Sequence, residues 1–136
     1  TRVRSSAASD VYKRQLISRS FAEMTRYAKK FKADKNTLFG LSGLGDLILT
    51  CSSKNSRNTQ FGIKLASSKY DNFLDLLKSQ EVTEGYYTVK AVYNISQKKN
   101  IDMPIMESVY NILYKQHDLK EELSNLLSRP ITEEKI

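Results

Sequence analysis

Residues 38–62, LFGLSGLGDLILTCSSKNSRNTQFG, are the stretch on which the rest of the chain depends. Within six residues, just before Asp46, lie three of the chain's five glycines: Gly40, Gly43 and Gly45. Glycine allows two backbones to approach closely and allows turns that other residues resist. The stretch therefore predicts a crowded corner at the entrance of a short apolar helix over residues 44–51, with the Asp46 carboxylate beside it. Close helix packing alone is the other interpretation of these glycines.

A polar triplet, Ser56-Arg57-Asn58, follows Asp46 by ten residues. Asparagine and serine are favoured N-caps, so Asn55 or Ser56 is expected to cap a helix that continues to about Ser67. Backbone N–H groups at such a start and a fixed guanidinium both attract anions. The residues thus place an acid that can orient a hydroxyl near a cradle for a phosphate-like group. A structural carboxylate at Asp46 and a solvated surface arginine at Arg57 are the alternatives.

The combination GLSGLGDLILTCSS, SRN and FG resembles the signature of the C-terminal, substrate-binding domain of bacterial NAD(P)-dependent glycerol-3-phosphate dehydrogenases. Four further segments occur in the order of that family: LISRSFAEMTRY at 16–27, VTEG at 82–85, MPIMESV at 103–109 and LSRP at 127–130. The resemblance implies an all-α fold, a multi-helix C-terminal domain of the 6-phosphogluconate-dehydrogenase-like type, over residues 16–136. Residues 1–15 are expected to be a non-native-looking or disordered tail, because no helical or strand period runs through them.

The resemblance also implies roles for individual residues. It implies that the substrate is bound by one carboxylate and the polar triplet: Asp46, Ser56, Arg57 and Asn58. It implies that NAD or NADP is contacted by Arg57, Val82 and Glu84. Taken alone, Glu84 would also suit the simpler role of an acid at a helix entry. The chain departs from many members of the family at Thr59 and Gln60, where those members have two basic residues.

The reaction that the resemblance implies is the interconversion of sn-glycerol 3-phosphate and glycerone phosphate, which feeds phospholipid synthesis in the cytoplasm. No G-x-G-x-x-G follows a strand pattern, so we expect this chain to lack the dinucleotide-binding domain. That domain is expected to be the partner with which this chain forms the substrate site. In the family, the lysine that acts as general base lies upstream of the segment matching residues 16–27, and Lys13 does not match it. The chain begins with Thr1 rather than Met, and we expect a fragment or processed product with no catalytic residue and no turnover of its own.

Composition restricts the class of protein further. The length of 136 residues and the 40% hydrophobic content indicate one globular domain, and no apolar run is long enough to span a membrane. The net charge of +7 suggests an anionic partner. The single cysteine, Cys51, excludes an intrachain disulfide, and inside an apolar run it is expected to be a small buried residue rather than a nucleophile. The lone histidine, His117, is expected at the surface, with no second histidine or cysteine pair to complete a metal site.

Apolar periodicity and capping residues predict the remaining helices. Two helix faces are indicated by i, i+3/i+4 spacing: Ile17, Phe21, Met24 and Ala28 on one helix, and Thr88, Ala91, Val92 and Ile95 on another. A short helix is expected to begin at Asp71. Pro104 is suited to the first position of a helix whose buried face carries Met106, Val109, Tyr110 and Leu113. Asp118 and Glu121 resemble a capping box at the start of a last helix that ends before Pro130.

Three other functions are alternatives to a dehydrogenase domain. The positive charge and eight tyrosines suggest a basic helical nucleic-acid-binding module, but the basic residues are scattered and no groove-reading motif is present, so we expect no nucleic-acid partner. A helical domain of another dehydrogenase of the same architecture, acting for example on a 3-hydroxy acid, would not need the phosphate-suited triplet. A purely structural or dimerising helical domain is the third alternative, and the sequence leaves a homodimer open.

Overall fold

A computed structural model of the chain describes residues 2–33, 36, 56–67 and 84–129, with side chains from residue 10 onward. These residues form five helices and no strand: α1 (Arg2–Lys30), α4 (Arg57–Ser67), α6 (Glu84–Lys99), α7 (Pro104–Tyr114) and α8 (Leu119–Leu127). The predicted all-α class is confirmed for this part of the chain. The helices expected over residues 44–51 and from Asp71 lie outside the described residues.

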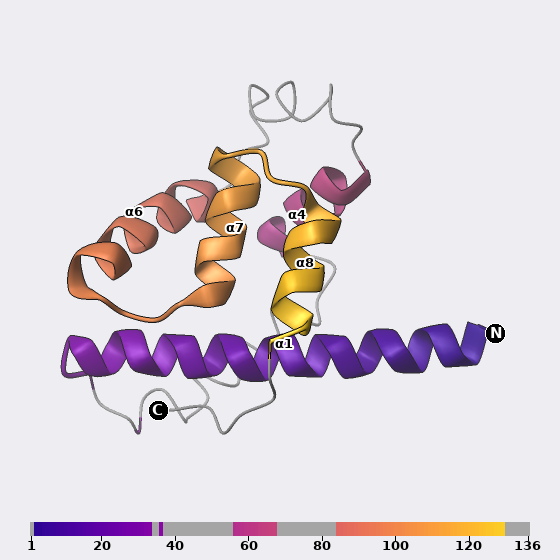
Figure 1. Ribbon diagram of the computed structural model, residues 1–136, viewed down its shortest axis with the longest axis horizontal. Coiled ribbons are helices and arrows are strands. Elements are labelled where there is room, and N and C mark those ends of the chain that lie inside the picture. The colour runs from indigo at the N-terminus through magenta and orange to yellow at the C-terminus, as the bar shows by residue number, and fades with distance from the viewer. Residues whose placement is uncertain (1, 34–35, 37–55, 68–83, 130–136) are drawn as a thin grey trace.

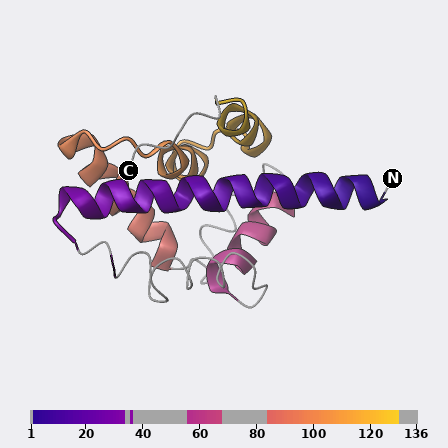
Figure 2. The same cartoon turned by 90° about the horizontal axis from the view of Figure 1, so that it is seen from below.

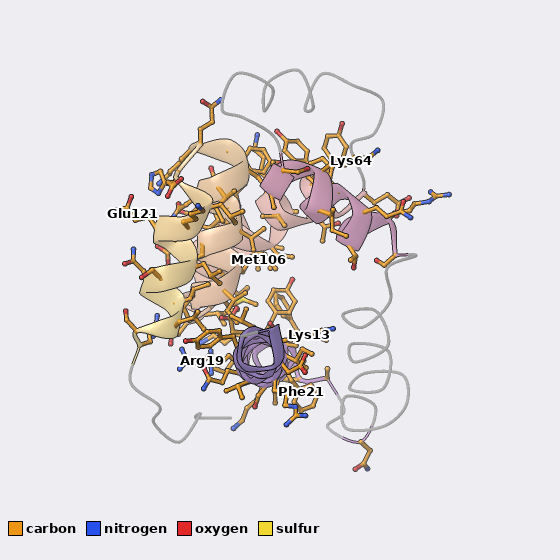
Figure 3. The ribbon with its side chains drawn as sticks, turned by 90° about the vertical axis from the view of Figure 1, so that its right-hand side faces the viewer. Lys13, Arg19, Phe21, Lys64, Met106 and Glu121 are labelled. Atoms are coloured by element: carbon orange, nitrogen blue, oxygen red, sulfur yellow. The ribbon has the colours of Figure 1, made fainter. Side chains whose placement is uncertain are left out.

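The long helix α1 runs along the bottom of Figure 1, and α4, α6, α7 and α8 lie above it in that view. Helix α7 is central, because it packs against α1, α6 and α8. In the view from below, α1 runs across the whole molecule in front of the other helices (Figure 2). Figure 3 looks along α1 and shows Met106 of α7 between that helix and α1, with Lys64 of α4 on the outer surface.

The middle of α1 supplies much of the described core. Phe21 is buried and Ile17, Met24 and Ala28 are half-buried, so the predicted apolar face is confirmed. The Thr25 side chain is also fully buried, and its hydroxyl donates to the carbonyl oxygen of Phe21 at 2.9 Å, which satisfies the polar group inside the core. Other helices and turns bring four further buried apolar side chains: Phe61, Met103, Leu113 and Leu126.

Helix α1 begins at Arg2, although the sequence predicted no regular structure for residues 1–15. Residues 2–15 contain neither glycine nor proline and include alanine, lysine, arginine and glutamine, which tolerate helix well. Extending a helix that is already anchored at residues 16–30 avoids the cost of a new nucleus. The missing apolar period therefore did not prevent a helix, and the domain boundary at residue 15 stays a prediction.

The helix starts follow their local sequence signals. Helix α7 has Pro104 at its first position, as predicted. The Asp118 carboxylate accepts a hydrogen bond from the Glu121 N–H at 3.1 Å, which confirms the predicted cap of α8. The helix ends use left-handed residues other than glycine, at Lys32, Asn100 and Gln116. The turns at Asn100 and Gln116 connect α6 to α7 and α7 to α8, and the connected helices pack against each other.

The predicted face of α6 is confirmed only in part, because Val92 and Ile95 are half-buried. Thr88 and Ala91 are exposed, whereas Ser96 is buried and the rings of Tyr86 and Tyr93 are half-buried against α7. The tyrosine rings pack by stacking, so the helix is rotated relative to the face that aliphatic periodicity alone would select.

Candidate functional site

The predicted polar triplet lies at the N-terminus of α4. Arg57 is the first residue of the helix and Ser56 precedes it. The Ser56 carbonyl oxygen accepts from the Gln60 N–H at 2.9 Å, and its hydroxyl oxygen accepts from the Thr59 N–H at 3.5 Å, a long contact. Ser56, one of the two residues expected at this position, is therefore the N-cap. Arg57 and Asn58 are exposed there, at the end of the helix that attracts anions.

Glu84 is the first residue of α6 and is also exposed. Asp46 and Val82, the other predicted site residues, lie outside the described residues, as do Cys51 and the three clustered glycines. The structure thus tests the location of four of the six predicted site residues, and it places them at two helix N-termini. Their roles in binding stay predictions.

The first turns of α4 and α6 meet at Asn58 and Gly85. A Cβ atom added to Gly85 would lie 2.5 Å from Oδ1 of Asn58, 3.1 Å from Cγ and 3.3 Å from Nδ2. Real Cβ atoms do not approach other atoms to 2.5 Å, so only a glycine fits at position 85 with the Asn58 amide where it is. The contact brings the predicted phosphate-binding triplet next to Glu84, the predicted cofactor contact.

The first turn of α6 is held from its other side by Tyr114 of α7. The Tyr114 hydroxyl donates to the Tyr86 carbonyl oxygen at 2.6 Å, and the two rings stack with centroids 4.6 Å apart. Burial raises the pKa of Tyr114 to about 12, with the neighbouring tyrosines adding to the effect, so the hydroxyl keeps its proton and remains a donor at neutral pH. No sequence pattern predicts this anchor, because nothing near residue 114 indicates its partner.

The tyrosine stack continues along the α6–α7 interface. Tyr110 stacks on Tyr114 with centroids 5.1 Å apart, and Tyr93 lies nearly parallel to Tyr110 at 3.7 Å. Lys90 and Lys115 place their ammonium groups 5.7 and 6.0 Å from the centres of the Tyr114 and Tyr110 rings. These contacts fix the position of α6 relative to α7, and thereby that of the first turn of α6.

A cavity of about 330 Å³ opens behind this meeting point, between α4, α6, α7 and α8. Asn58 and Gly85 line it together with mainly apolar side chains, among them Phe61, Leu65 and Ile112. A phosphate needs positive charge as well as donors, and no lysine or arginine lines this cavity. Arg57, the charged residue predicted to bind the phosphate, is instead exposed at the N-terminus of α4.

Two carboxylates away from these N-termini have shifted pKa values. Burial raises the pKa of Glu23, in the middle of α1, to about 7, against the opposing effect of hydrogen bonds from Ile105 and Met106. Burial of Glu122 acts to raise its pKa, but hydrogen bonds from His117, Ser108 and Asn111 lower it overall. His117 itself is 49% exposed and lies 2.8 Å from the Glu122 carboxylate. Both acids join helices to one another and do not face Asn58.

Within the described residues, no three histidine, cysteine, aspartate or glutamate side chains gather in a way that would hold a metal ion. In the same part of the chain, no helix combines the length and the apolar character needed to cross a bilayer.

The described part of the chain is an all-helical domain in which the N-termini of α4 and α6 lie next to each other. The sequence model described as the C-terminus of NAD-dependent glycerol-3-phosphate dehydrogenase matches residues 3–124. The chain therefore belongs to this family, as the sequence motifs predicted.

Individual relatives agree with the family assignment. The chain is 44% identical over 126 residues to the glycerol-3-phosphate dehydrogenase (NAD(P)+) of Ligilactobacillus salivarius, an alignment that covers 92% of this chain and 37% of that protein. It is 44% identical over 121 residues to the enzyme of that name from Phytoplasma mali, covering 88% of this chain and 36% of the relative. The chain thus spans little more than a third of the length of these curated relatives.

A solved structure gives the same result for the fold. The crystal structure of glycerol-3-phosphate dehydrogenase from Coxiella burnetii superposes with a TM-score of 0.76 at 35% sequence identity. The match covers 85% of this chain and 35% of the Coxiella chain. The helical arrangement described above is accordingly that of one part of a larger dehydrogenase.

Proposed function

We propose that this chain is the substrate-binding part of an NAD(P)-dependent glycerol-3-phosphate dehydrogenase and that it binds the phosphate of sn-glycerol 3-phosphate and glycerone phosphate. The observation that carries the proposal is the exposed Arg57-Asn58 pair at the N-terminus of α4, next to the first turn of α6. Membership of the family supports it. A helix N-terminus, a guanidinium and an amide together supply the donors that a phosphate dianion requires.

Each residue of the site has a distinct task in this proposal. Arg57 binds two phosphate oxygens at once, which a lysine cannot reproduce. Asn58 donates its amide hydrogens to a third oxygen, and Ser56 holds the start of the helix. Asp46 orients the hydroxyl end of the substrate. Binding of the remote phosphate thereby aligns the carbon that reacts, which lowers the entropic part of the barrier.

The cofactor proposed for the complete enzyme is NAD or NADP, which exchanges a hydride with the substrate when bound. The exposed Glu84 carboxylate at the start of α6 suits hydroxyl groups of a ribose, and the exposed Arg57 guanidinium suits a cofactor phosphate. With Val82, these residues would form the part of the cofactor site that this domain contributes. We propose that a separate dinucleotide-binding domain of the enzyme supplies most of the cofactor site. The lysine that moves the hydroxyl proton is likewise proposed to lie outside this chain.

The complete enzyme would act in the cytoplasm and supply sn-glycerol 3-phosphate to phospholipid synthesis, and a homodimer is proposed as one assembly. This chain alone would bind substrate without turning it over. Purified chain mixed with NADH or NADPH and glycerone phosphate should give no change in absorbance at the nicotinamide band. Measurable turnover would show that the chain contains a complete site, contrary to the proposal.

Phosphate recognition is tested directly by titrating isotopically labelled chain with sn-glycerol 3-phosphate and following backbone amides by NMR. Saturable shifts at residues 56–58 and at Asp46, absent with glycerol, are the expected result. Shifts with a short oligonucleotide would instead favour the nucleic-acid-binding alternative. Well-dispersed spectra that change with neither ligand would favour a purely structural helical domain.

A further inference from the structure

We propose that Gly85 is a positioning residue for the substrate phosphate: by having no side chain, it sets the place of the Asn58 amide. The inference rests on the proposed function, because it deepens the description of the same phosphate site. Gly85 is not one of the residues that the sequence motifs assign to substrate or cofactor. Its role follows from the contact between the first turns of α4 and α6.

The geometry leaves no room for a methyl group at position 85. The nearest atom to a Cβ there is Oδ1 of Asn58, at 2.5 Å, and all three of the nearest atoms belong to the Asn58 side chain. An alanine would therefore have to displace something by about an ångström, because normal van der Waals contact requires at least roughly 3.4 Å. The atoms in its way are the amide group that the proposed function assigns to phosphate binding.

The Asn58 side chain would move before helix α6 does. The first turn of α6 is held by the hydrogen bond from Tyr114 to the Tyr86 carbonyl oxygen and by the stack of the two rings. On the other helix, the hydrogen bond from Gln60 to Ser56 holds the backbone around Asn58. The Asn58 amide ends a side chain with two rotatable bonds, whereas a shift of α6 would break the Tyr114 contacts, so rotation of the amide is the cheaper relief of the clash.

Rotation of this amide matters for an anion in particular. A phosphate ester offers only acceptor oxygens at neutral pH, so Asn58 recognises it through the N–H groups on Nδ2. A hydrogen bond to a phosphate requires Nδ2 within about 3 Å of an oxygen and close to linear geometry. An alanine at position 85 would turn Nδ2 away from that geometry while leaving Arg57 and the start of α4 in place.

The test compares two glycine substitutions in the full 136-residue chain, Gly85→Ala and Gly62→Ala. Gly62 is the matched control, because it also lies in a helix of the site region and a Cβ there meets nothing within 4 Å. Affinity for sn-glycerol 3-phosphate is measured by NMR titration at fixed ionic strength, with glycerol as the ligand control. We expect Gly85→Ala to weaken binding roughly tenfold, the effect of losing one hydrogen bond to a charged group, and Gly62→Ala to leave it unchanged.

Two further readouts separate positioning from a general structural effect. The midpoint of thermal unfolding should not fall in Gly85→Ala, because a flexible side chain yields and alanine favours helix over glycine. In a double-mutant cycle, Gly85→Ala should add little in an Asn58→Ala background, because Gly85 acts through that amide. The side-chain amide resonances of Asn58 should shift in Gly85→Ala even without ligand.

Each contrary result has a definite meaning. Equal affinity of Gly85→Ala and the unsubstituted chain would overturn the inference and leave the proposed function standing. An undiminished effect of Gly85→Ala in the Asn58→Ala background, or unfolding of α6 in that variant, would also overturn it, because the clash would then act elsewhere than on the amide. No saturable binding of sn-glycerol 3-phosphate by the unsubstituted chain would overturn both the inference and the proposed function.

Discussion

The side chain of Glu23 in α1 caps the N-terminus of α7 at Ile105. Oε1 of Glu23 accepts a hydrogen bond from the Ile105 N–H at 2.5 Å, and Oε2 accepts one from the Met106 N–H at 3.2 Å. Glu23 is only 3% exposed, so this contact is enclosed in the core. Residues 82 positions apart are thereby joined, and the start of α7 is held against the middle of α1.

Replacing Glu23 by alanine should destabilise the chain by about 2 kcal/mol, because two buried N–H groups lose their acceptor. The free energy of unfolding is measured by urea denaturation. Glu107→Ala is the matched control, since Glu107 also lies in the first turn of α7 but is exposed. The control should change stability by less than about 0.5 kcal/mol. Equal effects of the two variants would show that the cap contributes nothing beyond surface charge.

Glu23 should also make stability depend on pH near neutrality. Because burial raises its pKa from 4.5 to about 7, the folded chain holds this proton more tightly than the unfolded chain does. The part of its contribution that depends on this proton is full below about pH 4.5, declines as the pH rises from 4.5 to 7 and is lost above 7, with an upper limit of about 3 kcal/mol. The nearby charges are Arg26, which opposes the shift, and Asp102, which adds to it.

The check is a series of urea denaturations between pH 4.5 and 8 on the unsubstituted chain and on Glu23→Gln. Glutamine cannot titrate, so its stability should not show the decline between pH 4.5 and 7. A decline of the same size in Glu23→Gln would assign the pH dependence to another group.

Glu122 should have the opposite effect in a lower pH range. Its pKa is lowered, with hydrogen bonds from His117, Ser108 and Asn111 outweighing burial. Its contribution to stability is therefore present above about pH 4.5 and is lost as the pH falls through the lowered value. Glu122→Gln should reduce the loss of stability below pH 4.5, measured by thermal unfolding in acetate and citrate buffers. If Glu122→Gln loses as much stability below pH 4.5 as the unsubstituted chain does, Glu122 is not the cause of that loss.

The features that could be predicted from the sequence are those set by nearby residues. The apolar face around Phe21, the proline at the start of α7 and the Asp118 cap of α8 each depend on residues within about one or two helical turns. The start of α4 at the polar triplet is of the same kind. The family motifs added the identity of the domain, which no local pattern contains.

The features that could not be predicted depend on distant residues. Glu23 interrupts an apolar helix face, but nothing near it in sequence shows that its partner is the start of α7. The Asn58–Gly85 contact likewise joins two helices, α4 and α6, whose first turns are 27 positions apart in the sequence. The same stack rotates α6 so that Thr88 and Ala91 are exposed. Aliphatic periodicity does not register ring stacking, so it identified Val92 and Ile95, which are half-buried, but not Tyr86 and Tyr93.

Arg19 should hold α8 against α1. Its guanidinium donates to the carbonyl oxygens of Leu126 at 2.7 Å and Arg129 at 3.2 Å, at and just beyond the C-terminal end of α8, where cations are favoured. Figure 3 shows Arg19 on the side of α1 that faces α8. Arg19→Ala should cost about 1–2 kcal/mol and speed hydrogen exchange of the α8 amides. Arg14→Ala, an exposed arginine on the same helix, is the control and should leave exchange in α8 unchanged.

Arg57 is the residue whose conservative replacement should be most informative about the site. Arg57→Lys keeps the charge, so any loss of affinity for sn-glycerol 3-phosphate reports the geometry of the guanidinium and not the general electrostatic field. A bidentate pair reduced to a single contact should weaken binding roughly tenfold. Lys64→Arg, an exposed basic position in the last turn of α4, is the charge-conserving control and should have no effect. If Arg57→Lys binds the phosphate ester as tightly as the unsubstituted chain, Arg57 acts only as one of many positive charges. The affinity should then fall with salt equally in both proteins, whereas a bidentate contact predicts a difference that persists at high ionic strength.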